Sequence, residues 1–355
     1  MLVGGEGTRL RPLTLTVPKQ MLPVVGVPMI ERVLGALAVH GIDEAVLSLG
    51  YLPDAFVRAY PDGEVAGVHL VYAVEPEPLD TAGAVRFAAR AGGVDDTFVV
   101  VNGDVVTDLD VSALVAFHRK HGAEGTIALH PVPDPSAFGV VPTDEHGRVT
   151  AFVEKPRREE APTDLVNAGT YVLEPSVLAR IPTGRAVSIE RETFPAMVAD
   201  GSLFAMDDGG AYWLDLGTPA AYVQACRDLL EGRRGEPPSP GARRGPGGAW
   251  TVGSPLVDGA VDQSCWVGDG ARVAAGAAVR RGVLGPGSVV EAGAAVIESV
   301  VLDGARVEAG AEVDGSIIGP RATVGAGAVV RGLSVVGAEA VVAPGTVLDG
   351  RRVPA

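Results

Sequence analysis

The sequence contains few aromatic residues, few cysteines and a deficit of positive charge. Aromatic residues make up 5% of the 355 residues, so Val, Ala and Gly fill the interior, a bias typical of β-rich or repetitive chains. Asp and Glu outnumber Lys and Arg by 44 to 29, and a net charge of −15 argues against nucleic acid or an anionic membrane as a partner. No apolar run is long enough to span a membrane, and no signal peptide is visible. The two cysteines, Cys226 and Cys265, lack metal-site spacing, which predicts reduced thiols and a cytoplasmic location.

The first 230 residues alternate short apolar runs with amphipathic stretches. The pattern predicts strands at 45–49, 68–74 and 97–101, and helices at 28–40, 81–91 and 111–121. Such alternation favours a mostly parallel, doubly wound α/β sheet, with ligands beyond the carboxyl ends of the strands. A Gly-, Pro- and Arg-rich segment at 232–248 has too few apolar residues to build a core, so we expect a linker or mobile loop there. The predicted domains are therefore 1–231 and 249–355.

An internal repeat fills the second domain. Its aliphatic residues recur at steps of six, occasionally five, at Val267, Val273, Val279, Leu284, Val290, Val296, Val301, Val307, Val313, Ile318, Val324, Val330, Val336, Val342 and Leu348. Each group of three predicts one triangular coil whose flat sides each point one aliphatic residue inward. Gly and Ala crowd the intervening positions, as tight corners require. The repeat predicts a hexapeptide-type parallel β-helix of about five coils that bury their core by stacking.

A glycine-rich loop follows the short apolar start of the chain. Glycines after a strand let backbone N–H groups approach phosphate oxygens, and a helix N-terminus there would add a favourable dipole. The loop is neither a Walker A sequence nor a dinucleotide fingerprint, because Leu10 occupies the third glycine position. A glycine turn alone is weak evidence, but Arg9 in the loop and Lys19 nearby supply the cations that phosphoryl transfer requires.

The loop is one of a series of motifs that together resemble the nucleoside-diphosphate-sugar pyrophosphorylases. The first is Gly4-Gly-Glu-Gly-Thr-Arg-Leu-Arg-Pro-Leu-Thr14 followed by Pro18-Lys19. The others follow in order as Asn102-Gly-Asp104, Phe152-Val-Glu-Lys-Pro156, Asn167-Ala-Gly169 and Trp213-Leu-Asp-Leu-Gly-Thr218. The resemblance covers nearly the whole chain. It implies a Rossmann-like, mixed-sheet nucleotidyltransferase domain followed by a left-handed β-helix. Relatives enter the loop from a full strand, whereas Met1-Leu2-Val3 precede it here, so we expect either that this sequence starts downstream of the natural one or that the first strand is truncated.

The resemblance also implies a role for individual residues. The catalytic residues would be Arg9, Lys19, Asp104 and Asp215, with Mg²⁺ held by the two carboxylates. The nucleoside triphosphate would contact Leu2, Gly4, Gly5, Gly7, Thr8, Glu75, Asp80, Gly83, Asn102 and Gly103. The sugar 1-phosphate would contact Gly139, Glu154, Lys155, Asn167 and Thr170. The implied reaction is attack of the sugar phosphate on the α-phosphorus, with release of pyrophosphate and no covalent intermediate.

The base and the sugar are less sharply indicated. In the segment Glu75-Pro-Glu-Pro-Leu-Asp80-Thr-Ala-Gly83, relatives usually have glycine where this chain has Asp80, whose carboxylate could accept hydrogen bonds from guanine. The motifs around Asn167, Ser188 and Tyr212 look most like mannose-1-phosphate guanylyltransferases, which predicts GTP and mannose 1-phosphate. The pair Lys19-Gln20 instead resembles glucose-1-phosphate thymidylyltransferases. Transfer of a thymidylyl, uridylyl or adenylyl group to glucose 1-phosphate therefore stays open.

Two rival classes fit the same motifs. A regulatory paralogue would bind a nucleotide sugar without turnover, but it would be marked by loss of the four catalytic residues, all of which are present. An acyltransferase built on the β-helix would need a histidine base, and the last histidine is His146, well before the repeat. We therefore expect the β-helix to be structural and to support a homo-oligomer or an allosteric surface. His118 and His121 lie on a polar helix and are predicted to be solvated.

Overall fold

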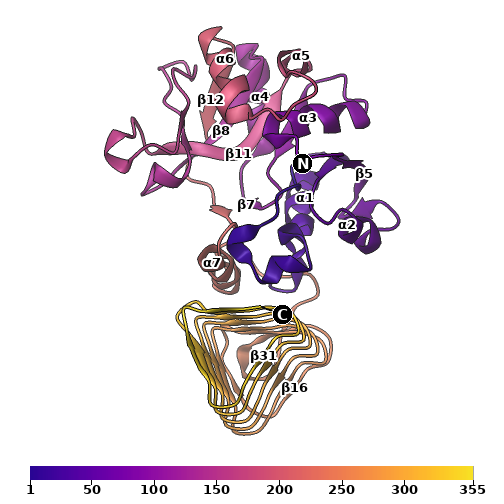
Figure 1. Cartoon of the computed structure of the whole chain (residues 1–355), viewed down its shortest axis with the longest axis vertical. Helices are drawn as coiled ribbons and strands as arrows, with labels where there is room; N and C mark the ends of the chain where they lie inside the picture. The colour runs from indigo at the N-terminus through magenta and orange to yellow at the C-terminus, as the bar shows by residue number, and fades with distance from the viewer. Residues whose placement is uncertain (355) are drawn as a thin grey trace. The chain divides into compact units, whose positions relative to one another are not determined.

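The structure is a computed structural model that describes residues 1–354, without the side chain of Pro246 (Figure 1). These residues group into two compact units. The α/β unit contains Met1–Gly5 and Ile30–Leu214, and the solenoid unit contains Glu6–Met29 and the chain from Asp215 onward. The units cut across the expected domain of residues 1–231, because the chain between Glu6 and Met29 and the helix before the solenoid belong to the solenoid unit.

A mixed sheet forms the centre of the α/β unit. Its strands are β3 (Glu44–Leu49), β4 (Glu64–Val65), β5 (Val68–Val74), β6 (Phe98–Val101), β8 (Gly125–Pro131), β9 (Gly139–Val140), β10 (Val153–Glu154), β11 (Leu165–Leu173) and β12 (Leu203–Asp207). Strands β3 and β5 are parallel, as are β8 and β12, whereas β11 runs antiparallel to β6, β8 and β9. The mixed sheet that the resemblance implies is confirmed, whereas the alternation of strands and helices favoured a mostly parallel one. The sheet is mixed because no helical crossover connects β8 to β11 and the chain returns through the short strands β9 and β10.

The first strand of the sheet is reduced to a single bridging residue. Leu2 bridges in parallel both Ser48, in β3, and Asn102, which follows β6. Its N–H donates to the carbonyl of Val101 at 2.9 Å, and its own carbonyl accepts from Gly103 N–H at 3.0 Å. Leu2 therefore joins the two parts of the sheet. Beyond it, a cavity of about 590 Å³ lies between β3 and β6.

Helices cover both faces of this sheet, which confirms the doubly wound arrangement. They are α1 (Met29–Val39), α2 (Asp54–Ala59), α3 (Asp80–Ala91), α4 (Val111–His121), α5 (Val177–Arg180) and α6 (Phe194–Ala199), with short strands β7 (Val105–Thr107) and β13 (Trp213–Asp215) nearby in the sequence. Leu37 of α1 and Leu114 of α4 pack in one core cluster with Val172 of β11. Val85 of α3 and Phe194 of α6 pack in another with neighbouring residues of β11 and β8. The predicted strands and helices of this half are all present.

One helix packs differently from its prediction. His118 of α4 is buried rather than solvated, with 1% of its surface exposed. Its Nδ1 lies 2.8 Å from Thr126 Oγ1 in β8, and its Nε2 lies 2.9 Å from Glu174 Oε1, after β11. The helix therefore turns a polar residue toward the sheet, where two polar partners satisfy it.

The solenoid unit contains a parallel β-helix of three sheets, seen as stacked triangular coils in Figure 1. The first sheet is β14 (Arg243–Arg244), β15 (Trp250–Thr251), β18 (Trp266–Val267), β21 (Val283–Leu284), β24 (Val300–Val301), β27 (Ile317–Ile318), β30 (Val335–Val336) and β33 (Arg352–Val353). The second is β16 (Leu256–Val257), β19 (Arg272–Val273), β22 (Val289–Val290), β25 (Arg306–Val307), β28 (Thr323–Val324) and β31 (Val341–Val342). The third is β17 (Ala260–Val261), β20 (Ala278–Arg280), β23 (Ala295–Ile297), β26 (Glu312–Asp314), β29 (Val329–Arg331) and β32 (Val347–Asp349).

The predicted aliphatic positions form the core of this β-helix. Val267, Leu284, Val301 and Ile318 pair in register along one sheet, and all are fully buried. Every other predicted position is buried too, except Leu348, which packs against the cluster at its end. The strands of the solenoid begin at Trp250, within the predicted domain of residues 249–355 and one coil before the first predicted aliphatic position. In that coil Thr251 stands where an aliphatic residue would continue the repeat, since it pairs with Val267.

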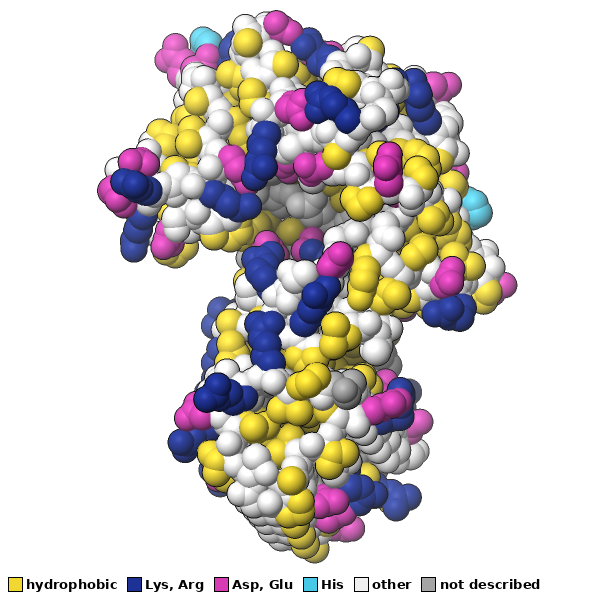
Figure 2. Space-filling model, in the orientation of Figure 1, with side chains coloured by type: hydrophobic (Ala, Val, Ile, Leu, Met, Phe, Trp, Pro, Cys, Tyr) yellow, Lys and Arg dark blue, Asp and Glu magenta, His cyan; other side chains and the backbone are white. Residues whose placement is uncertain are grey.

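Charged side chains lie on the outside of the coils. Both signs are present on the face of the solenoid in Figure 2, and Arg321 and Arg331 pair with Glu339 and Asp349 of neighbouring coils. Exposed pairs of this kind contribute little stability. The stacked core therefore holds the coils together.

The segment expected to be a linker folds onto the start of the solenoid. Strand β14 pairs antiparallel with β15, and Ser239 Oγ accepts a buried hydrogen bond from Trp266 Nε1 at 2.9 Å. The Arg244 guanidinium lies 3.9 Å from the centre of the Trp250 ring. The segment has few apolar residues of its own, but the solenoid's tryptophans supply the surface on which it packs. It covers the first coil, as terminal caps do in repeat proteins.

The solenoid unit also includes the helix α7 (Pro219–Leu230) and the short strands β1 (Pro23–Val24) and β2 (Val27–Pro28). Thr218 caps α7, since its hydroxyl oxygen accepts from Ala221 N–H at 3.2 Å. Among residues 1–354, no helix combines the length and apolar character needed to cross a membrane.

Candidate active site

In the solenoid unit, the glycine loop forms a tight turn that places Arg9 and Lys19. Gly7 has a left-handed backbone with φ of 61°, and Thr14 Oγ1 donates to its carbonyl at 2.8 Å. A Cβ on Gly7 would lie 3.1 Å from the Cβ of Lys19, so the lysine stem packs against the turn. Thr8–Leu10 forms a single 3-10 turn rather than the start of an α-helix, because Pro12 has no N–H to continue one. The expected helix dipole is therefore small, and a phosphate bound here would depend more on the cations.

Arg9 and Asp215 meet at Gly217. A Cβ on Gly217 would overlap the Arg9 guanidinium and lie 2.8 Å from Asp215 Oδ1. The Asp215 carboxylate also accepts a hydrogen bond from the Gly217 N–H at 2.7 Å. Only glycine leaves room for both charged groups here. The loop and the motif around Asp215, some 200 residues apart in sequence, therefore form one charged cluster in the solenoid unit.

In the α/β unit, residues predicted to contact the nucleotide gather at the ends of β3, β5 and β6. A Cβ on Gly4 would lie 3.4 Å from Glu75 Oε1, and Gly5 follows it at the end of this unit's first segment. Glu75 is held in place because Ser48 Oγ and Leu79 N–H donate to its two oxygens at 2.8 and 3.2 Å. This carboxylate is thus oriented before any ligand binds.

Leu2, Asn102 and Gly103 share the backbone pairing described above, and Asp104 follows them directly. Asp104 is 9% exposed and lies in the turn after β6, at the carboxyl end of a strand as expected. Asn102 N–H donates to Gly169 O at 2.9 Å, which connects this turn to β11.

The segment predicted to read the base leads into α3, which begins at Asp80. Asp80 is exposed and has φ of 58°, a left-handed conformation that is uncommon for a residue with a side chain. Its Oδ1 accepts from Thr81 N–H at 2.7 Å. Gly83 is buried in α3, where a Cβ would lie 2.9 Å from the Cβ of Leu79, so the structure gives it a packing role. Nucleotide contact by these two residues stays a prediction.

Residues predicted for the sugar lie on β9, β10 and β11. Gly139 and Glu154 are directly opposite in the β9–β10 pair, and a Cβ on Gly139 would lie 3.1 Å from Glu154 Oε2. Lys155 has φ of 49° and its ammonium lies 3.0 Å from Glu154 Oε1. Thr170 is buried in β11 opposite Val101.

A register shift in β11 places Asn167. The pairing of β11 with β8 is interrupted between Asn167 and Tyr171, where Gly169 has φ of 74°. Asn167 Oδ1 accepts from Gly169 N–H and its Nδ2 donates to Tyr171 Oη, both at 2.9 Å. Trp213 Nε1 holds the same bulge through a 2.9 Å bond to Ala168 O. Bulges of this kind commonly re-aim side chains beside functional sites.

Glu190 is a further candidate site residue, which the sequence analysis did not single out. Burial of Tyr171, together with the negative charges of Glu190 and then Glu154, raises the pKa of its hydroxyl, so both carboxylates lie near that group. Thr81 Oγ1 and Ser188 Oγ donate to Glu190 Oε2 at 2.7 and 2.9 Å. Glu190 thereby links the start of α3 to the residues predicted for the sugar. Its signal was the Ser-Ile-Glu motif, which contributed to the resemblance without being given a role.

The two carboxylates predicted to hold a divalent cation are Asp104, in the α/β unit, and Asp215, in the solenoid unit. Asp104 and Asp215 offer hard carboxylate oxygens, and Mg²⁺ is commonly held by one or two carboxylates together with substrate phosphates. Among residues 1–354, no cluster of His, Cys, Asp and Glu would hold a metal by protein ligands alone.

Comparisons with known proteins agree with this picture. The nucleotidyl transferase family model matches residues 1–232, and the GMPPB C-terminal domain model matches residues 261–355. A mannose-1-phosphate guanylyltransferase of Mycobacterium tuberculosis is 44% identical over 80% of this chain and 78% of its own. A probable mannose-1-phosphate guanylyltransferase 1 of Oryza sativa subsp. japonica is 39% identical over the same shares. The crystal structure of HddC from Yersinia pseudotuberculosis complexed with GMP-PN gives a TM-score of 0.56 at 28% identity, over 64% of this chain and 97% of that one.

Proposed function

We propose that this chain, which belongs to the nucleotidyl transferase family, transfers a guanylyl group from GTP to mannose 1-phosphate and releases pyrophosphate. The observation that carries the choice of substrates is the long similarity to guanylyltransferases that are named for mannose 1-phosphate. A structural relative complexed with GMP-PN adds support for a guanine nucleotide.

The reaction is an in-line displacement between two anions. An oxygen of the sugar phosphate attacks the α-phosphorus, a new P–O bond forms, and the bond to the oxygen that bridges to the β-phosphorus breaks. The electron pair leaves with pyrophosphate. Arg9 and Lys19 balance the negative charge of the triphosphate, and Lys155 that of the sugar phosphate. Glu154 and Asn167 orient the sugar through its hydroxyls, and no side chain acts as a nucleophile.

Asp104 and Asp215 would hold Mg²⁺, whose chemistry is to neutralise phosphate charge as it develops. The Gly217 N–H donates to Asp215 Oδ1, which orients the carboxylate for this task. Arg9 lies against the same glycine, so the guanidinium and the carboxylate are placed together.

Asp80 is our proposed reader of guanine. Its exposed carboxylate can accept from the N1–H and the 2-amino group of guanine, a pattern that adenine, uracil and thymine do not present. Replacing Asp80 with Gly should reduce the preference for GTP over other triphosphates, measured as a ratio of kcat/KM values. Unchanged selectivity would remove Asp80 from the site.

Pyrophosphate release tests the whole proposal. GTP, dTTP, UTP and ATP are each combined with mannose 1-phosphate and glucose 1-phosphate, and we expect GTP with mannose 1-phosphate to be turned over fastest. A preference for dTTP with glucose 1-phosphate would favour the thymidylyl alternative. That alternative rests on Gln20, which is 1% exposed and so packs in the solenoid unit away from solvent. Release from no pair would favour a regulatory, non-catalytic protein.

We also propose that the protein is cytoplasmic and forms a homo-oligomer with help from its β-helix. Reduced thiols fit such a location, and both cysteines are buried without a disulfide. Sedimentation of the full chain gives the mass in solution, and a monomer would contradict the assembly.

A further inference from the structure

The predicted phosphate-binding residues are tied to the far end of the β-helix. Arg352, in the last strand β33, donates from Nη1 to the carbonyl of Arg11 at 2.8 Å. Arg11 follows Arg9 by two residues, and its own Nη2 donates to Glu6 Oε2 at 2.6 Å. The last strand of the solenoid thus contacts the residue at the end of the turn that carries Arg9.

The hairpin after Lys19 rests on the start of the β-helix. Gly26, at the tip of the β1–β2 hairpin with φ of 75°, lies so close to the Trp266 ring that a Cβ would overlap it. Trp266 itself is 3% exposed and is held by its bond to Ser239. The buried hydroxyl of Tyr222, in α7, donates to the carbonyl of Pro23 in the same hairpin. The segment between Glu6 and Met29 is therefore held by α7 and by both ends of the solenoid.

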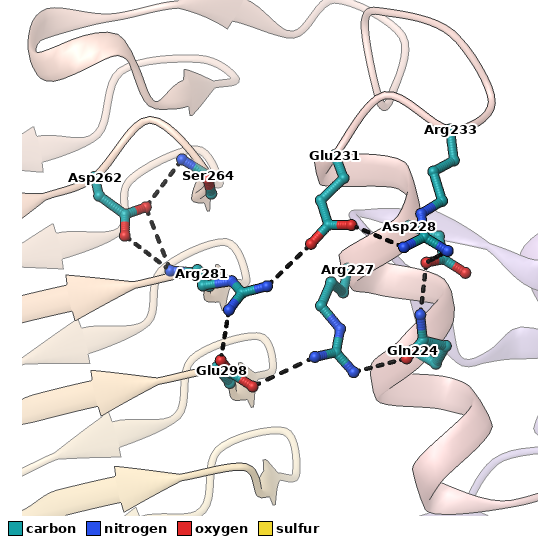
Figure 3. A network of polar contacts seen from close by, with 9 residues as sticks. All are labelled: Gln224, Arg227, Asp228, Glu231, Arg233, Asp262, Ser264, Arg281 and Glu298. Carbon is teal, nitrogen blue, oxygen red and sulfur yellow. Dashed lines mark hydrogen bonds and ion pairs between the residues drawn. The ribbon is translucent and has the colours of Figure 1, made fainter.

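Helix α7 is in turn fastened to the coils by a network of charges (Figure 3). Glu298 lies 3.5 Å from Arg227 of α7 and 2.8 Å from Arg281 of the neighbouring coil. Arg281 also reaches Glu231, after α7, at 3.1 Å. Asp215 lies four residues before α7. The contacts that fix α7 against the coils therefore also limit where this carboxylate can lie.

We propose that the β-helix positions the triphosphate-binding half of the active site, and that Arg352 is a positioning residue for Arg9. Arg352 acts through the backbone carbonyl of Arg11, two residues after Arg9. Displacement between two anions depends on alignment, so a loop that must also order itself on binding loses rate. This role rests on the proposed function and adds to it, since it assigns the β-helix a part in catalysis within one chain.

Three variants of the full chain test the proposal. Arg352→Ala removes the donor, Arg352→Lys restores one, and Arg331→Ala is the matched control, since Arg331 pairs within the solenoid with Asp349 at 3.1 Å. We expect Arg352→Ala to raise KM for GTP by about ten-fold, the worth of one charge-assisted hydrogen bond. The KM for mannose 1-phosphate should stay unchanged, and Arg352→Lys should recover part of the loss.

The outcomes separate positioning from stability and from the proposed function. A merely structural role would lower the melting temperature of Arg352→Ala without raising KM for GTP relative to KM for mannose 1-phosphate. That result would overturn the proposal. Kinetic constants equal to those of Arg331→Ala would overturn it too. Wild-type protein without turnover would count against the proposed function. In that case the Kd of GTP, measured by titration calorimetry, still decides: weaker binding by Arg352→Ala than by Arg331→Ala supports positioning, and equal binding refutes it.

Discussion

Gly217→Ala is predicted to damage catalysis while leaving the fold intact. The backbone of Gly217 lies outside the left-handed region, so alanine meets no conformational strain there. Its methyl group, however, would overlap the Arg9 guanidinium and lie 2.8 Å from Asp215 Oδ1. An ordinary contact begins at 3.4 Å, so the carboxylate must move by about 0.6 Å and the guanidinium must move away as well.

The size of the effect follows from that displacement. Misplacing a reacting or charge-balancing group by roughly 1 Å costs on the order of 100-fold in rate, so we expect kcat/KM to fall by about 10- to 100-fold. The melting temperature should change by no more than about 2 °C, because Arg9 is exposed and free to swing toward solvent.

Pyrophosphate release measures this prediction, with thermal unfolding of the same preparations beside it. Gly35→Ala in α1 is the matched control, because a Cβ there would meet only Ala66 at 3.8 Å. That variant should retain full activity and gain up to about 1 kcal/mol from better helix propensity. If Gly217→Ala kept kcat/KM within about two-fold of wild type, the cluster of Arg9 and Asp215 could not be part of the site as described.

Three further predictions concern the metal, the β-helix core and pH. Chelation should abolish pyrophosphate release and Mg²⁺ should restore it in the wild type, whereas Asp215→Asn should stay at least about 100-fold slower with Mg²⁺ present. Val307→Ala, in the solenoid core, should lower the free energy of unfolding by about 2 kcal/mol in chemical denaturation, while exposed Val341→Ala in the same sheet should cost less than about 0.5 kcal/mol; equal losses would contradict the buried register. The hydrogen bond from His118 holds the pKa of Glu174 in the folded protein below its ordinary value of 4.5. The contribution of this hydrogen bond to stability is therefore complete above pH 4.5 and is lost as the pH falls through the pKa of the folded protein. Glu174→Gln should therefore flatten the fall in melting temperature between about pH 5 and pH 3, and an unchanged slope would place the titration elsewhere.

The β-helix was the most predictable part of the fold. Its inward positions, such as Val301 and Ile318, repeat at a regular spacing that is typical of a β-helix. Because each coil contacts only the neighbouring coils, the sequence of a few coils suffices to predict the fold. The helices and strands of the first half were also predictable, because their periodicity is local. His118 was not, since a helix face that looks polar in sequence turns inward once Thr126 and Glu174 offer partners.

The motifs of the candidate site could be predicted from the sequence, but the positions of these motifs relative to other parts of the chain could not. Nothing in the segment between Glu6 and Met29 indicates that it belongs with the β-helix, because the contacts that place it come from Arg352 and Trp266, hundreds of residues away. Glu190 was missed for the same reason: its partner Thr81 lies 109 residues away in the sequence. Long-range contacts of this kind leave no local periodicity to detect.

The sequence by itself determined the chemistry and the building blocks of this protein. Residue types set which groups can bind phosphate or a divalent cation, and the hydrophobic periods set where strands, helices and coils form. Tertiary structure alone decided which of these groups stand together. It joined Arg9 to Asp215 across Gly217 and tied both to the solenoid, because packing and hydrogen bonding act between neighbours in space, whatever their separation along the chain.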